Sequence, residues 1–156
     1  MIIINGDFLC RNLTGIERFA FETCKHLDSL IEKNQIGIYI PKNAKTIPDY
    51  NNIKVIISKK ECKVFPLWEH FEFGKFVKKS KYTPLDFSNV TPIGTKGIVF
   101  IHDIYAKLYS KDFSRFRDKL INKYMCLMYR YATKHAKLLL TVSEFSRTQI
   151  ANTYKI

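Results

Sequence analysis

Two residues that could take part in acid–base or hydrogen-bonding chemistry, His102 and Asp103, directly follow an uninterrupted apolar run, Ile98–Ile101. A run of valine, isoleucine and phenylalanine without a polar break is typical of a strand buried on both faces of a parallel sheet. Such a strand delivers the residues after it to the carboxyl edge of the sheet, where open α/β sheets bind ligands. The pair could supply a proton donor, a partner for a sugar hydroxyl or a charge beside a developing cation. The structural alternative is a histidine bonded to backbone and an aspartate that closes a turn or caps a helix.

The stretch Thr14-Gly15-Ile16 stands before an apolar periodicity that predicts a helix ending near Asn34. The unpaired N–H groups at a helix start could bind a diphosphate, and Gly15 would let the backbone come close to it. However, Thr14 and Glu17 match a capping box, which would satisfy those amides within the protein. The segment matches neither G-x-G-x-x-G nor a phosphate-binding loop of the G-x-x-x-x-G-K type.

Short apolar runs and helical periodicities alternate along the chain. Strands are predicted at 2–5, 36–40, 53–57, 85–87, 98–101 and 138–142, and helices at 16 to about 34, 67–79, 114–136 and 144–154, the last capped by Ser143. Alternation of this kind predicts right-handed βαβ units, and hence an α/β fold with a Rossmann-like parallel sheet flanked by helices.

Four of these strands are directly followed by polar residues. They are Asn5-Gly6, Ser88-Asn89, His102-Asp103 and Ser143-Glu144. Because the carboxyl ends of parallel strands share one edge of a sheet, we expect all four pairs to lie on that edge.

The composition is that of one domain with a proper core, since the chain has 156 residues of which 46% are hydrophobic. No apolar run approaches the roughly 18–20 residues of a membrane span, and the first residues lack the basic region of a signal peptide. We therefore expect a cytoplasmic protein. The four widely spaced cysteines suggest reduced structural thiols, and no spacing of metal ligands is visible, so no metal site is predicted.

The formal net charge of +12 predicts an anionic partner, namely nucleic acid, an acidic membrane or a phosphorylated substrate, unless it reflects only a solvated lysine-rich surface. The predicted basic helix 114–136 could lie peripherally on the inner face of an anionic membrane, or could pack on the core with its basic face in solvent. Its expected apolar stripe consists of Phe113, Phe116, Leu120, Tyr124, Leu127 and Tyr131. Only the net charge favours a nucleic-acid partner, and the absence of any known nucleic-acid-binding motif argues against such a partner.

Five motifs occur in an order and spacing that resemble the N-terminal half of family 4 glycosyltransferases, of the kind that build bacterial O-antigen and capsule. They are Asn5-Gly6, Leu13–Ala20, Leu67-Trp68-Glu69, Ile101–Ile104 and Thr141–Arg147. The resemblance implies a GT-B fold, in which two Rossmann-like domains face each other across a cleft, with retention of anomeric configuration and without a metal. Residues 1–156 would be the single acceptor-side domain, and the C-terminal domain that binds the nucleotide sugar would be absent.

The resemblance also implies roles for individual residues. His102 would sit near the transferred sugar with Asp103 beside it, as the catalytic pair. Thr14 and Gly15 would face the donor phosphates.

The remaining residues that the resemblance singles out would line other parts of the cleft. Ser143 and Glu144 would lie along it, and Asn89 would lie on the acceptor side. Arg18 would be an anionic contact on that side or, equally, a structural residue of the first helical turn.

The expected function is therefore the acceptor-binding half of a hexosyltransferase-like enzyme, inactive by itself. The enzyme would transfer a sugar from a nucleotide sugar to a polysaccharide or lipid-linked acceptor. The nucleotide sugar would be a substrate and not a cofactor. A partner could carry the missing domain. Glu61 and Glu69 have the family's Glu-x₇-Glu spacing, but outside its setting, and Trp68-Glu69-His70 is interpreted as a packed helix start. The alternative function is a non-catalytic, membrane-associated module that binds an acceptor or a partner subunit.

Overall fold

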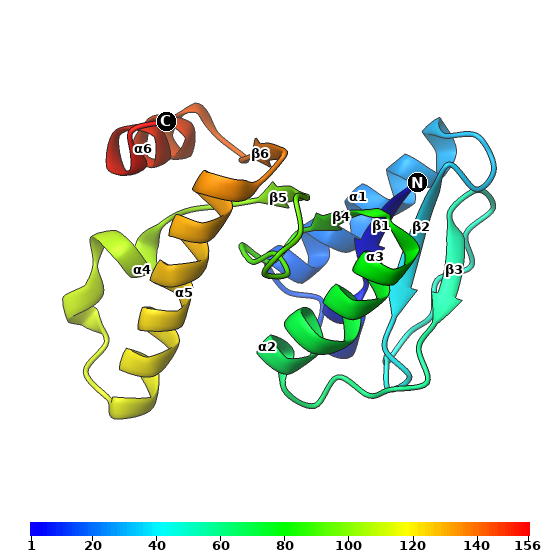
Figure 1. Cartoon of the computed structure of the whole chain (residues 1–156), viewed down its shortest axis with the longest axis horizontal. Helices are drawn as coiled ribbons and strands as arrows, with labels where there is room; N and C mark the ends of the chain where they lie inside the picture. Colours follow the sequence, from blue (N-terminus) through cyan, green and yellow to red (C-terminus); the bar gives the residue numbers. More distant parts are fainter.

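A computed structural model describes residues 1–156 and shows a sheet of six parallel strands (Figure 1). The strands are β1 (Ile2–Asn5), β2 (Ile36–Ile40), β3 (Lys54–Ile57), β4 (Thr83–Asp86), β5 (Ile98–Phe100) and β6 (Leu138–Leu140). Their order across the sheet is β3-β2-β1-β4-β5-β6, and every neighbouring pair is parallel. The predicted α/β, Rossmann-like fold is confirmed.

Helices connect the strands close to the predicted positions. They are α1 (Ile16–Leu30), α2 (Phe65–Leu67), α3 (Gly74–Ser80), α4 (Tyr105–Leu108), α5 (Phe116–His135) and α6 (Glu144–Tyr154), with short 3₁₀ turns η1 (Asp7–Cys10) and η3 (Ser110–Asp112). A π-helical segment, η2 (Trp68–Phe73), joins α2 to α3 in one continuous helix. Helix α1 ends before the predicted Asn34, which adopts a positive φ of 66° in the following loop.

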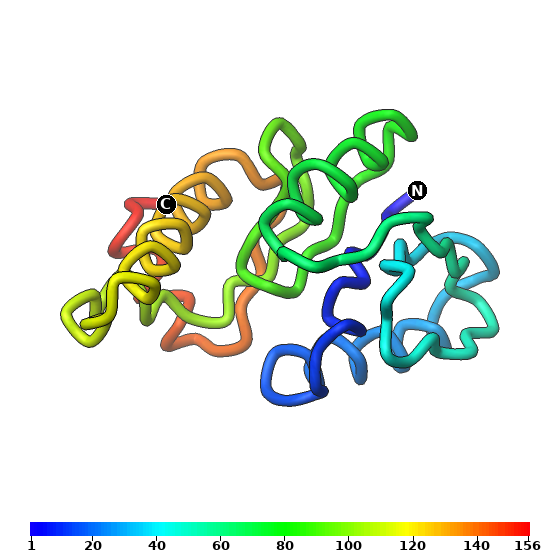
Figure 2. The backbone as a smooth tube through the Cα atoms, turned by 90° about the horizontal axis from the view of Figure 1, so that it is seen from below, coloured from blue at the N-terminus to red at the C-terminus, as the bar shows by residue number.

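Helices cover both faces of the sheet, as Figures 1 and 2 show. On one face, α1 buries Ala20 and Cys24 against Ile4 and Ile38. On the other face, the α2–α3 helix packs on Ile3 and Tyr39, and α5 packs on Val99 and Ile101. Successive residues Ile3 and Ile4 thus enter opposite cores, because side chains alternate along a strand. No helix is both long enough and apolar enough to cross a membrane.

The predicted apolar stripe of α5 is wrong about which side faces the core. Phe116, Leu120 and Leu127 are exposed. The helix instead buries Asn122, Met128, Tyr129 and Ala132. Residue spacing shows which side chains share a helix face, but the position of the sheet decides which face is covered.

The predicted capping box at α1 is also wrong, whereas the predicted cap of α6 is confirmed. Gly15, with φ 51° and ψ −113°, is the N-cap of α1 and no side chain caps this end. Glu17 accepts a hydrogen bond from Arg11 at 3.0 Å instead. At α6, the Ser143 hydroxyl accepts a hydrogen bond from the Ser146 N–H at 3.1 Å.

Candidate functional site

The strand order contains a topological switch point between β1 and β4. From β1 the chain builds outward to β3, then returns to place β4 on the other side of β1. Crossovers diverge at such a point, which leaves a crevice at the carboxyl ends of the two strands. Asn5 and Asp7 lie there at the end of β1, and Asp86 ends β4.

A cavity of about 630 Å³ occupies this position, between α2, α5 and the loop after β4. Its size is within the usual range of small-molecule sites. Its polar and charged lining residues are Asp7, Arg11, Lys63, Glu69, Ser88, Asn89, Arg117 and Tyr124, and its apolar lining comes chiefly from Ile16, Val64, Phe65, Ile121 and Met125.

Three carboxyl groups are buried at this edge of the sheet: those of Asp7 and Glu69 line the cavity, and that of Asp86 ends β4. Asp7, Glu69 and Asp86 are only 3%, 4% and 1% exposed. The Asn5 side chain holds one of them, because its Nδ2 donates to Glu69 Oε2 at 2.5 Å while its Oδ1 accepts from Trp68 Nε1 at 2.9 Å. The adjacent residues Trp68 and Glu69 are both buried at the start of the π-helical segment, where a π turn often marks a functional site.

Burial keeps these carboxyl groups protonated to unusually high pH. It raises the pKa of Asp7 to about 6, although Arg11 opposes the shift. Burial also raises the pKa of Glu69 and Asp86, and the charge of Asp86 raises that of Glu69 further. A protonated carboxyl can both donate and accept a hydrogen bond.

Several carboxyl oxygens have no hydrogen-bond partner within the protein. They are Asp7 Oδ1, Glu69 Oε1 and both oxygens of Asp86. Because the Asp7 and Glu69 side chains line the cavity, their carboxyl groups are suited to the hydroxyl groups of a polyol.

Arg11 ties together the segments that form one side of the cavity. Its guanidinium bonds Asp7 at 3.1 Å and Glu17 at 3.0 Å, and lies 3.7 Å from the centre of the Phe65 ring. It thereby links η1, α1 and α2. Together with Arg11, Lys63 and Arg117 place cationic groups along the cavity that Asp7 and Glu69 also line.

His102 is held beside this region by three contacts. Its backbone N–H donates to Asn89 Oδ1 at 2.7 Å, and its ring Nε2 lies 2.9 Å from the carbonyl oxygen of Phe87. Its ring packs edge-on against Phe19, with centroids 5.0 Å apart. Because Phe19 lies one turn after Gly15, the fold brings His102, Asn89 and the start of α1 together.

Gly15 is open to solvent, with no atom within 4 Å of the place a Cβ would take. Thr14 and Arg18, the other two residues singled out around this turn, are also exposed. None of these three residues lines the switch-point cavity.

The other three residues that the sequence singled out make local contacts elsewhere on the carboxyl edge. Asp103 accepts the backbone N–H of Tyr105 at 2.8 Å and so closes a turn, and it lines a separate cavity of about 220 Å³ against α6. Ser143 caps α6. Glu144 forms an exposed ion pair with Arg147.

Sequence reasoning missed the buried carboxyl cluster. Glu69 was interpreted as part of a packed helix start, and neither Asp7 nor Asp86 drew attention. The available signals were Asp7 directly after the Asn5-Gly6 strand ending and Asp86 within an apolar run. The spacing of Glu61 and Glu69 carries no function here, because Glu61 lies in another cavity, paired with Lys63 at 3.2 Å.

No family model, curated protein or solved structure matches this chain. No group of three or more histidine, cysteine, aspartate or glutamate side chains is placed to hold a metal ion. The functional argument therefore depends on the switch-point cavity and on the residues beside it.

Proposed function

We propose that this chain is the acceptor-binding half of a retaining, metal-independent glycosyltransferase. The observation that carries the proposal is the switch-point cavity, which is lined by the carboxyl groups of Asp7 and Glu69. A sugar acceptor offers many hydroxyl groups, which a carboxylate such as Asp7 can accept from and a protonated carboxyl such as Glu69 can both accept from and donate to. The motif resemblance to family 4 glycosyltransferases supports the same assignment.

The start of α1 is suited to the donor phosphates. No side chain caps this end, and the exposed Gly15 leaves space for a ligand to approach the backbone. Amide groups at a helix start attract anions through their unpaired hydrogens and the helix dipole. A diphosphate bound there would lie one helical turn from the residue that packs against His102.

His102 would then act on the transferred sugar. As the nucleoside diphosphate leaves, the sugar C1 gains positive charge, and a fixed hydrogen bond to the sugar stabilises that transition state. The Asn89 contact fixes the backbone at His102, and the contacts to Phe87 and Phe19 fix its ring in advance. Because Nε2 already bonds Phe87, we assign the sugar contact to Nδ1.

The rest of the donor site would come from a second Rossmann-like unit, on the same polypeptide or on a partner. Residues 1–156 build only one sheet, so we expect this chain alone to show no turnover.

The test is a His102→Ala change in an enzyme that combines this chain with a donor-binding unit. We expect turnover to fall about 100-fold or more, as when a preorganised hydrogen-bonding group that contacts the transition state is removed. The matched control is His26→Ala, an exposed histidine on α1, which should leave turnover unchanged. Near-normal turnover of the His102→Ala variant would contradict a role of His102 in stabilising the transition state.

A second candidate is a non-catalytic module that holds an acceptor or a partner subunit. It is favoured by the unpaired outer edge of β6, where Leu138 is exposed, as is Val142 two residues after the strand. An uncovered apolar strand edge is a ready surface for another chain. Glycan binding without transfer, even when a donor-binding unit is supplied, would favour this candidate.

A further inference from the structure

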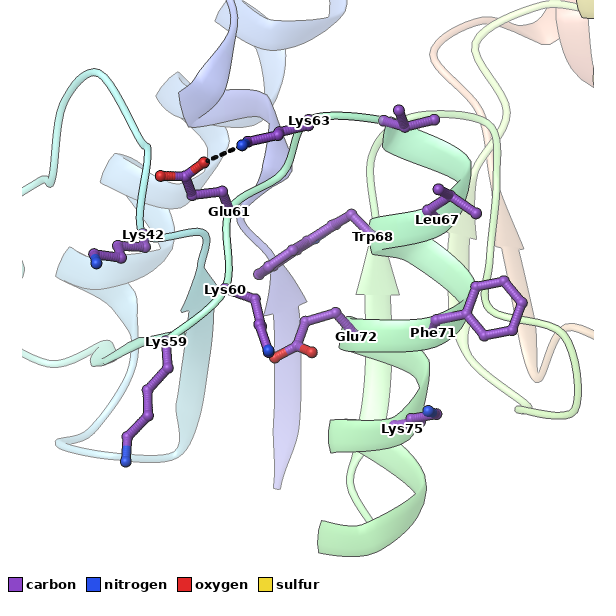
Figure 3. Close-up of a pocket in the computed structure, with 11 residues that line it drawn as sticks. Lys42, Lys59, Lys60, Glu61, Lys63, Leu67, Trp68, Phe71, Glu72 and Lys75 are labelled. Carbon is purple, nitrogen blue, oxygen red and sulfur yellow. Dashed lines mark ion pairs between the residues drawn. The ribbon is translucent and has the colours of Figure 1, made fainter.

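A second cavity, of about 540 Å³, lies beyond the ends of β2 and β3 and beside the continuous helix α2–η2–α3 (Figure 3). Five lysines line it, against two acidic residues. The lysines are Lys42, Lys59, Lys60, Lys63 and Lys75, and the acidic residues are Glu61 and Glu72. We call this cavity the lysine cleft.

The carboxylates of the cleft are already engaged. Glu61 pairs with Lys63 at 3.2 Å. Glu72 accepts hydrogen bonds from the hydroxyls of Tyr39 and Ser58, each at 2.9 Å.

The remaining four lysines therefore have no carboxylate within ion-pair distance. Like charges gathered in a concave surface produce a strong positive potential. Such a cleft attracts anions.

The helix beside the cleft carries exposed apolar side chains. Val64, Leu67 and Phe71 are 51%, 55% and 59% exposed, and their spacing places them along one side of the helix. Figure 3 shows Trp68 and Glu72 pointing toward the lysine-bearing segment, and Leu67 and Phe71 on the side of the helix away from it. Lysines beside protruding apolar side chains are typical of surfaces that bind the interface of an anionic bilayer.

Helix α5 borders the same face. Its Tyr124 hydroxyl lies 3.1 Å from His70 Nε2, which joins α5 to the π-helical segment η2. Leu120 and Leu127, four residues before and three after Tyr124, are exposed as well. We define the docking face as the lysine cleft with the exposed Leu67 and Phe71 beside it.

We propose that this face docks on an anionic lipid bilayer, with lipid phosphates in the lysine cleft and Leu67 and Phe71 inserted beside them. Nucleic acid fits less well, because the cleft has a single exposed aromatic residue and no arginine, whereas single-strand binders stack successive bases on several aromatics. Lys63 and Val64 line both the lysine cleft and the switch-point cavity. Docking would thus hold the proposed acceptor site close to the lipid surface.

The test measures partition of the whole chain onto vesicles by sedimentation, with no need for enzyme activity. We expect binding to vesicles that contain phosphatidylglycerol and little binding to pure phosphatidylcholine. Changing Lys42, Lys59 and Lys60 together to Gln should weaken the partition coefficient about 100-fold, since each lysine near an anionic surface contributes about fivefold. Leu67→Ser with Phe71→Ser should weaken it at least about tenfold.

Matched controls change the same residue types elsewhere. Lys25, Lys33 and Lys111 to Gln, and Leu30→Ser with Phe145→Ser, alter exposed side chains outside the face and should leave binding near wild type. Circular dichroism confirms folding. Trp68, the only tryptophan, lines the cleft, so its emission should change when vesicles bind.

Three results would overturn the proposal. They are equal losses in the control and cleft variants, equal binding to phosphatidylcholine, and displacement by inorganic phosphate at constant ionic strength. The last result would indicate a site for free phosphate. Because the measurement uses neither donor nor acceptor, its failure would leave the glycosyltransferase proposal standing.

Discussion

The Nε2 atom of His102 lies 2.9 Å from the carbonyl oxygen of Phe87. A carbonyl only accepts hydrogen bonds, so Nε2 must carry a hydrogen. Nδ1 is then the nitrogen available to a ligand. It accepts a hydrogen bond when the ring is neutral and donates one only when the ring is protonated.

This contact predicts the tautomer of His102. Nitrogen-15 NMR at pH 8.5 should show the Nε2–H form for His102. The exposed His26 has no such acceptor and should show a tautomer mixture. A dominant Nδ1–H form of His102 would contradict the contact.

The buried Asp86 predicts that stability falls as pH rises. The unfolded carboxyl titrates near pH 4, whereas burial raises the pKa in the folded chain. Between these two values the folded state binds more protons, so the free energy of unfolding decreases with rising pH. From pH 5 to pH 8 the free energy of unfolding should therefore fall less in Asp86→Asn than in the wild type. The two decreases should differ by more than about 1 kcal/mol.

Urea unfolding at pH 5, 6, 7 and 8 measures this difference. The exposed Asp49→Asn change is the control and should keep the wild-type slope. An unchanged slope in Asp86→Asn would rule out a protonated Asp86 in the folded state.

Replacing the hydroxyl residue before each helix by alanine should lower stability by different amounts at α6 and at α1. Ser143 caps α6, so Ser143→Ala should cost about 1 kcal/mol. Thr14 caps nothing, so Thr14→Ala should cost less than about 0.5 kcal/mol. Gly15→Ala should cost about 1–3 kcal/mol, because its backbone conformation suits only glycine. Chemical denaturation of the three variants checks the order, and equal costs for Thr14 and Ser143 would contradict it.

The cysteines should differ sharply in reactivity. A hydrogen bond from Cys62 lowers the pKa of Cys10, whereas burial raises that of Cys24 to about 12. Since the thiolate is the reactive form, an aromatic disulfide reagent at pH 7.5 should modify Cys10 first and Cys24 only after unfolding. Cys10→Ser should remove the fast phase, while Cys126→Ser should retain it. A fast phase that persists without Cys10 would refute this assignment.

The elements of the fold could be predicted from sequence because their signals are local. The apolar run before His102 and the periodicity after Gly15 each depend on neighbouring residues. The order of the strands has no such local signal, so the switch point between β1 and β4 could not be predicted either. The sequence therefore predicted that ligands bind at the carboxyl edge of the sheet, but not where along that edge the cavity lies.

The errors arose where distant residues compete with local patterns. Glu17 fits a capping box, but Arg11, which also bonds Asp7, takes its carboxylate. Glu69 is buried because Asn5, 64 residues earlier, donates to it. Charged side chains are usually placed outside by sequence reasoning, so a buried carboxyl cluster escapes it unless the tertiary partners are known.

The most direct test of the proposed acceptor site is an NMR titration of the chain with a panel of neutral and phosphate-linked oligosaccharides. We expect at least one to bind and to shift the resonances of Asn89 and Met125, which line the switch-point cavity. Ser88→Phe, which fills that cavity, should weaken binding at least about tenfold, and the exposed Ser114→Phe should not. Binding by no member of the panel, or equal binding by both variants, would contradict the proposed acceptor site.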